Sequence, residues 1–153
     1  MIIITTQCFY PNIGGIEALM TGMAAAMYKS GKDILVVADG KKDKDEKIKT
    51  YNVKRFNGWK PIRRIKKAKY ISQLCKTNNI EAIYADSWKS VEYLKNVNVP
   101  IFVLAHGTEI QKNINNLNFY KKIKQKRIFS SYNKSKKILA NSNYTKELIK
   151  ESL

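Results

Sequence analysis

The chain has 153 residues, of which 44% are hydrophobic, so it is long and apolar enough to form one globular domain. Its apolar runs are shorter than the roughly 18 residues of a membrane-spanning helix, and its first residues contain no basic segment typical of a signal peptide. We therefore expect a cytoplasmic protein. Two cysteines without CxxC spacing and a single histidine argue against a disulfide framework and a zinc site, and we expect no metal and no cofactor.

The net charge of +17 arises from 29 basic and 12 acidic residues, and lysine far outnumbers arginine among the basic ones. A lysine excess is typical of a solvated surface, whereas readers of phosphates and bases favour the bidentate fork of arginine. An anionic partner, either a membrane surface or a phosphorylated substrate, remains the alternative. We expect no nucleic acid as a partner, because the chain contains no RNA-binding aromatic motif, recognition-helix pattern or zinc knuckle.

Short apolar, β-branched runs alternate with longer segments of helical periodicity along the chain, with a charged loop at residues 41–49. Residues 16–28 are apolar on nearly all sides, so we expect that helix to be largely buried. The alternation predicts an α/β fold: a doubly wound, mostly parallel Rossmann-like sheet of about six strands flanked by helices. The expected strands span residues 2–5, 33–38, 50–56, 82–85, 100–105 and 137–140, and the expected helices span 16–28, 61–78, 88–95, 119–132 and a segment capped by Ser142.

Polar side chains gather where the expected strands end. Asp86 follows the fourth strand, His106 and Glu109 follow the fifth, and the polar segment 141–145 follows the sixth. Ligands of open parallel sheets bind beyond the carboxyl ends of the strands, so we expect a crevice there. His106 can be either a hydrogen-bonded structural residue or a residue of the functional site. Asp86 and Glu109 can either bind sugar hydroxyls or cap the helices that follow them.

The pair Gly14 and Gly15 stands where the first helix is expected to begin. Free backbone N–H groups and the positive end of the helix dipole would form a phosphate site there, although a tight turn explains the glycines equally well. The G-x-G-x-x-G and Walker patterns are absent, which argues against nicotinamide binding and P-loop hydrolysis.

The segment KPIRRIKKAK, residues 60–69, contains six basic residues and no acid. On a helix its isoleucines line one side and its cations flank them, so it is suited both to packing on the sheet and to lying on anionic lipid headgroups. The residues that we expect to face such a membrane are Arg63, Arg64, Lys66 and Lys67.

Three segments in sequence carry a family resemblance: FYPNIGGIE at residues 9–17, HGTE at 106–109 and ILANSNYTKELI at 138–149. Together they resemble the N-terminal, acceptor-side domain of family-4 retaining glycosyltransferases, which have the GT-B fold. The resemblance covers essentially the whole chain.

The resemblance implies a role for several residues. The turn of Gly14 and Gly15 would meet the donor diphosphate or an acceptor phosphate, and His106 would act in catalysis beside the anomeric centre of the transferred sugar. Family members that act on lipids carry a basic amphipathic helix on this domain, which agrees with residues 60–69. The residues that would face the acceptor are Glu17, Asp86, Asn141 and Thr145.

In this family the nucleotide site and an E-x7-E motif belong to a C-terminal domain that has no counterpart among residues 1–153. We therefore expect this chain to be one half of an enzyme and to be inactive alone. With its second domain it would transfer a sugar, with retention, from a nucleotide-sugar donor to a lipid-linked or cell-surface glycan acceptor. The alternative is a stand-alone module that binds an anionic membrane or a phosphorylated ligand. The expected location is the cytoplasm, including a peripheral position on the inner face of the cell membrane.

Overall fold

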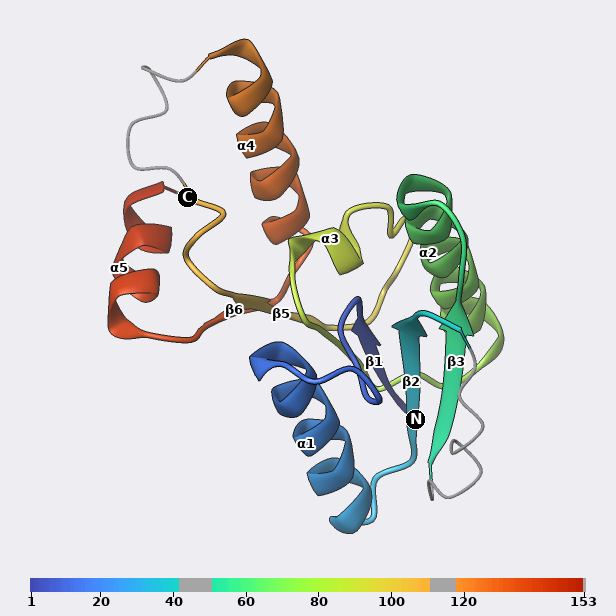
Figure 1. The fold of residues 1–153 in the computed structure, drawn as a ribbon. Coiled ribbons are helices and arrows are strands. Elements are labelled where there is room, and N and C mark those ends of the chain that lie inside the picture. The colour runs from blue at the N-terminus through green and yellow to red at the C-terminus, as the bar shows by residue number, and fades with distance from the viewer. Residues whose placement is uncertain (42–50, 111–117, 153) are drawn as a thin grey trace.

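The computed structural model describes residues 1–41, 51–110 and 118–152. Within these ranges six strands form a single parallel sheet in the order β3-β2-β1-β4-β5-β6 (Figure 1). This arrangement confirms the α/β, Rossmann-like fold expected from the sequence. The strands are β1 (Ile2–Thr6), β2 (Ile34–Asp39), β3 (Asn52–Phe56), β4 (Ala82–Ala85), β5 (Ile101–Ala105) and β6 (Lys137–Ala140).

Helices connect β1 to β2, β3 to β4, β4 to β5 and β5 to β6. The expected cap Ser142 is confirmed, since its Oγ accepts from the backbone N–H of Thr145 (3.1 Å). Asn118 caps α4 in the same way, with its Oδ1 accepting from the backbone N–H of Lys121 (3.0 Å). The helices are α1 (Gly15–Lys29), α2 (Lys60–Thr77), α3 (Trp88–Val91), α4 (Phe119–Tyr132) and α5 (Asn143–Ser152).

The sheet separates two apolar clusters. One face packs against buried residues of α2, α3, α4 and α5, such as Ile71, Val91 and Ile128. The opposite face packs against Met20 and Ala24 of α1. Strands β1 and β2 are buried at every position, because each lies inside the sheet and is covered on both faces.

Two expectations about helices are wrong. Among the residues of α1 only Met20 and Ala24 are buried, while Leu19 is 48% exposed, because this helix contacts the sheet along one side only. The helix expected at residues 88–95 ends at Val91, and Asn96 has a left-handed backbone (φ 53°) that starts a turn towards β5. The charged loop expected at residues 41–49 lies almost entirely outside the described residues.

The strand order places a switch point between β1 and β4. The chain leaves β1 towards β2 on one side and later returns to β4 on the other, so the connections diverge from the carboxyl ends of these two strands. Such a divergence leaves a crevice at the sheet edge, where ligands of doubly wound folds bind. The segments that follow β1, β4 and β5 meet at this edge.

Candidate functional site

The carboxylate of Asp86 joins the ends of β1 and β4. Its Oδ2 accepts hydrogen bonds from Thr6 Oγ1 (3.0 Å) and the backbone N–H of Gln7 (2.7 Å). Its Oδ1 accepts from Ser90 Oγ (2.5 Å) and Ser87 Oγ (3.2 Å). With four donors and an exposed fraction of 2%, this carboxylate fixes the floor of the crevice rather than presenting a free acid.

His106 is held in one orientation above that floor. Its Nε2 lies 2.8 Å from the carbonyl oxygen of Asp86, and since a carbonyl only accepts, Nε2 donates. In the neutral ring Nδ1 is then an acceptor, and it has no hydrogen-bond partner among the residues that the structure describes. The backbone N–H of His106 donates to Glu109 Oε1 (3.1 Å), so the HGTE segment closes on itself.

Glu109 is in turn anchored from α4. The hydroxyl of Tyr132 donates to its Oε1 (2.5 Å), and Gln125 Nε2 donates to its backbone carbonyl (2.7 Å). Burial of the phenol, followed by its contact with this carboxylate, raises the pKa of Tyr132. The hydrogen bonds that join α4 to Glu109 and Glu109 to the backbone of His106 therefore hold the loop after β5 in place.

These segments surround a cavity of about 250 Å³ at the carboxyl edge of the sheet. Burial, together with the negative charges of Asp86 and Glu17, raises the pKa of the Cys8 thiol to about 11, so Cys8 contributes a neutral thiol to the cavity wall at physiological pH. The lining residues come from four segments: Gln7, Cys8, Ile16, Asp86, Ser87, Trp88, Lys89, His106, Thr108 and Glu109.

The glycine pair stands at the start of α1 beside this cavity, with Gly14 as its N-cap. A Cβ on Gly14 would lie 2.3 Å from Glu17 Oε2, so this glycine admits the carboxylate of Glu17, which folds back over the helix N-terminus. Gly15, in contrast, would have no neighbour within 4 Å of a Cβ. An anion that approaches this turn therefore meets open space at Gly15 and a negative charge beside Gly14.

Asn141 and Thr145 form a separate group at the start of α5. Thr145 Oγ1 donates to Asn141 Oδ1 (2.8 Å), and Thr145 is 2% exposed, whereas Asn141 is exposed. Gly107 has a left-handed backbone (φ +84°), and a Cβ there would lie 2.6 Å from Thr145 Oγ1. The hydroxyl therefore packs α5 against the loop that carries His106, and only Asn141 of this pair is open to a ligand.

A comparison with protein-family models decides the family. The model of Glycosyltransferase Family 4 matches residues 13–153. The chain belongs to glycosyltransferase family 4. The match confirms the family that the three motifs resemble. It begins two residues before α1 and runs to the end of the chain. No match is found among curated proteins.

The basic segment of this family-4 domain differs from the sequence expectation. Lys67 is 3% exposed and points inward, where its Nζ donates to Asp39 Oδ1 (2.9 Å) and the carbonyl of Thr6 (2.6 Å). Burial lowers the pKa of Lys67 while the charge of Asp39 opposes that shift. The expectation that Lys67 faces a membrane is therefore wrong, because its stem follows the apolar stripe and its ammonium ties β1 to β2.

The two arginines of the segment are also engaged within the domain. Arg63 Nε lies 2.9 Å from Asp39 Oδ2 as an ion pair, and Arg64 Nη1 lies 3.7 Å from Glu92 Oε2. Their side chains are 17% and 18% exposed. Of the four residues expected at a membrane only Lys66 is exposed, and none of the described helices is long and apolar enough to cross a bilayer.

The structure thus brings together Asp86 and His106 in one cavity with the start of α1 beside it, and it leaves Asn141 and Thr145 outside that cavity. Sequence reasoning missed the inward-facing Lys67. The spacing of Lys67, Ile71 and Leu74 along α2 is a signal that could have found it, since residues four and three apart share one helix face.

Proposed function

We propose that this family-4 domain is the acceptor-side half of an enzyme that transfers a sugar, with retention, from a nucleotide-sugar donor to a lipid-linked or cell-surface glycan acceptor. The observation that carries the proposal is the cavity at the switch point, in which His106 Nδ1 is an available acceptor on an oriented ring. Its size suits one sugar residue better than a dinucleotide, and its polar walls suit hydroxyl groups.

The proposed roles follow the geometry. His106 would accept from a hydroxyl of the transferred sugar, and Lys89 would supply the one cationic side chain among the lining residues. Asp86 would position the ring of His106 through its backbone carbonyl instead of binding the acceptor itself. Gly15 would leave room for a phosphate, with Glu17 displaced or paired to a cation when the anion arrives.

A second domain would have to supply the nucleotide site and the cations that stabilise a departing diphosphate, because the crevice of this half is rich in acids. We therefore expect no turnover from residues 1–153 alone.

The single histidine gives a direct test of the acceptor site. In protein labelled at histidine, one imidazole signal reports on the cavity without assignment. A panel of sugars, sugar phosphates and polyprenyl phosphate analogues should include a compound that moves the His106 signal and the indole signal of Trp88 together. The indole of Trp59, which is 72% exposed and does not line the cavity, is the internal control. Ligands that bind the domain but leave His106 unmoved would contradict the proposal.

A peripheral position on an anionic membrane is part of the proposal, because the acceptor would be lipid-linked. The exposed patch that supports it differs from the one expected from the sequence: Trp59 and Ile62 are 72% and 48% exposed at the start of α2, with exposed Lys66 one turn further on. Aromatic and aliphatic side chains beside lysines are typical of interfacial helices.

Co-sedimentation with vesicles that contain phosphatidylglycerol tests this position. The double variant Trp59→Ala/Ile62→Ala should lose most of the binding. The matched control, Phe119→Ala/Tyr120→Ala, removes two aromatic side chains that are 73% and 81% exposed at the start of α4 and should bind as the parent does. Equal losses in both variants would overturn the membrane assignment.

A further inference from the structure

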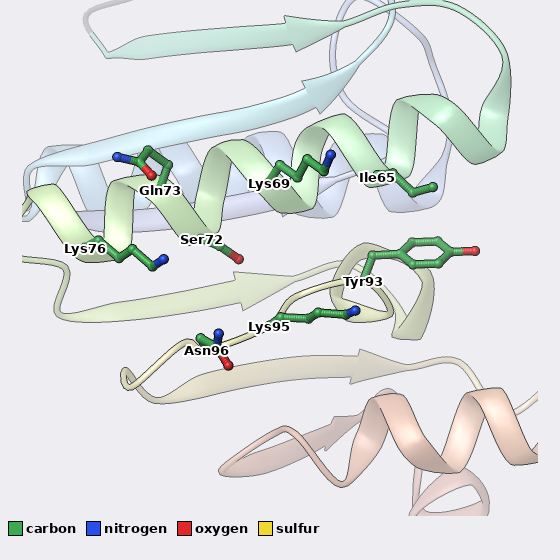
Figure 2. Close-up of a pocket in the computed structure, with 8 residues that line it drawn as sticks. All are labelled: Ile65, Lys69, Ser72, Gln73, Lys76, Tyr93, Lys95 and Asn96. Atoms are coloured by element: carbon green, nitrogen blue, oxygen red, sulfur yellow. The ribbon is translucent and has the colours of Figure 1, made fainter.

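A second concavity, of about 540 Å³, lies between α2 and the segment that leads from α3 to β5 (Figure 2). The wall on α2 follows one helix face, since Ile65, Lys69, Ser72 and Lys76 are spaced by four, three and four residues. The opposite wall is the segment 93–96. We call this concavity the α2 groove, and its lining residues are Ile65, Lys69, Ser72, Gln73, Lys76, Tyr93, Lys95 and Asn96.

The α2 groove collects positive charge from both walls. Lys69 and Lys76 project from α2 and Lys95 from the opposite segment, and all three are exposed. No acid lines the groove, and none of these three lysines has an ion-pair partner among the described residues. The nearby carboxylate of Glu92 is already paired with Arg127 (2.6 Å). Cations in a concavity of low dielectric reinforce one another and attract an anion more strongly than the same cations on a convex surface.

Neutral hydrogen-bond donors lie between the lysines. Figure 2 shows the hydroxyl of Ser72 on the side of α2 that faces the segment 93–96, and Asn96 beside Lys95 on that segment. The left-handed backbone of Asn96 (φ 53°), which asparagine tolerates better than most residues, makes the turn that holds Lys95 opposite α2. At one end of the groove Ile65 and Tyr93 supply an apolar wall. Figure 2 shows the three ammonium groups well apart from one another, so each would meet a different oxygen of a ligand that carries more than one negative charge.

We propose that the α2 groove binds a phosphorylated ligand with at least two negative charges, its phosphate oxygens held by Lys69, Lys76 and Lys95 and its organic part lying against Ile65 and Tyr93. The α2 groove shares no lining residue with the cavity at His106, so it is a second site on the domain. The proposal does not rest on sugar transfer, and the phosphate would come either from a soluble compound or from a lipid headgroup.

Titration of the ¹⁵N-labelled domain tests the site, with inorganic pyrophosphate as the soluble probe and vesicles of phosphatidylcholine with or without phosphatidylglycerol as the lipid probe. The groove variant is Lys69→Gln/Lys76→Gln/Lys95→Gln. The matched control, Lys121→Gln/Lys122→Gln/Lys124→Gln, removes the same charge from exposed positions of α4. Because all six lysines are exposed, both variants should keep the unfolding midpoint of the parent.

We expect the groove variant to bind the phosphate probe about tenfold or more weakly than the parent, while the control loses less than about threefold. In the parent, pyrophosphate should shift the backbone signals of Ser72 and Asn96. Loss of pyrophosphate binding assigns a soluble phosphate, and loss confined to phosphatidylglycerol vesicles assigns a lipid headgroup. Equal weakening in both variants for both probes would mean diffuse attraction by the net charge and would overturn the proposal. The proposal would also be overturned if the parent bound neither probe.

A second variant checks the groove without removing a lysine. Ser72→Glu places a carboxylate on the floor of the groove among the three ammonium groups. It should weaken binding of the same probe at least as much as a single Lys→Gln change, because the carboxylate takes the place of the anion. Unchanged affinity in Ser72→Glu would contradict the proposed position of the phosphate.

Discussion

The buried ammonium of Lys67 is a severe test of the structure, since the sequence alone suggested the opposite position. In Lys67→Met the aliphatic stem is kept and the charge is lost. Asp39 Oδ1 then loses its partner at 2.9 Å and the carbonyl of Thr6 loses a donor at 2.6 Å. The ion pair of Asp39 with Arg63 remains.

The expected cost follows from this geometry. Removing one member of a buried ion pair costs about 3–5 kcal/mol, and the remaining Arg63 places this case near the lower end, at about 3 kcal/mol. A domain of this length unfolds with an entropy of about 0.3 kcal/mol/K, so the midpoint of thermal unfolding should fall by about 9 °C. Urea unfolding followed by circular dichroism, with the midpoint and the slope fitted separately, measures the same change.

Lys66→Met is the matched control, because Lys66 is exposed and has no hydrogen-bond or ion-pair partner in the described part of the chain. It should change the free energy of unfolding by less than about 0.5 kcal/mol. The double variant Asp39→Asn/Lys67→Met should lose less stability than the sum of its two single changes, since each single change leaves the charge of the other residue buried without this partner. Equal effects of Lys67→Met and Lys66→Met would refute the inward position of Lys67 and restore it to the surface.

Three further changes probe the crevice. Gly107→Ala should cost more than about 1 kcal/mol, because of its left-handed backbone and the clash with Thr145 Oγ1, and adding Thr145→Ala should recover the steric part of that loss in urea unfolding. The rate of Cys8 alkylation, measured by mass spectrometry, should rise with pH with a midpoint near pH 11, because the raised pKa keeps the thiol protonated from pH 9 up to that point. Glu17→Gln should lower this midpoint, since it removes a negative charge beside the thiol. A midpoint near pH 9 in the parent would contradict the buried, acidic surroundings of Cys8. Tyr132→Phe should destabilise the domain by about 2 kcal/mol, since a charged acceptor loses its donor, and a loss under about 0.5 kcal/mol would show that the bond is not maintained.

The fold could be predicted because its signals are local. Most strands are short, mainly apolar runs such as Ile34–Asp39, and turns or helix starts that the residue types mark lie between them. The expected ends of β4, α4 and β6 agree with the structure to the residue. The position of polar residues at the carboxyl edge followed from the parallel sheet alone.

The helices that were misjudged depend on tertiary contacts. The apolar residues of α1 do not reveal which of them meet the sheet, and Leu19 stays exposed although its type suggests burial. The sequence favours a surface position for Lys67, because lysine is rarely buried without a partner. Its partner Asp39 lies 28 positions away in the sequence, so no local pattern reveals the pair.

The sequence predicts that polar residues gather at the carboxyl edge of the sheet, but it does not predict the contacts that hold them there. Asp86 and His106 do lie in one cavity, yet the bonds that fix them join residues up to 80 positions apart, such as Thr6 and Asp86. Thr145 was expected to face a ligand, and its hydroxyl is instead used between Asn141 and the loop after β5. Which donor reaches which acceptor is decided by the packed strand ends, and no local pattern encodes that choice.

Sugar transfer by this domain together with a nucleotide-sugar-binding domain tests the proposed function most directly. The domain would be co-expressed with a nucleotide-sugar-binding domain of a family-4 glycosyltransferase, and transfer of labelled sugar from a panel of nucleotide-sugars to polyprenyl phosphate and glycan acceptors would be measured. We expect transfer only when both domains are present, a fall of about a hundredfold or more in His106→Ala, and parent-like transfer in the exposed control Lys29→Met. Undiminished transfer by His106→Ala would contradict the assignment of the cavity as the site of the reaction.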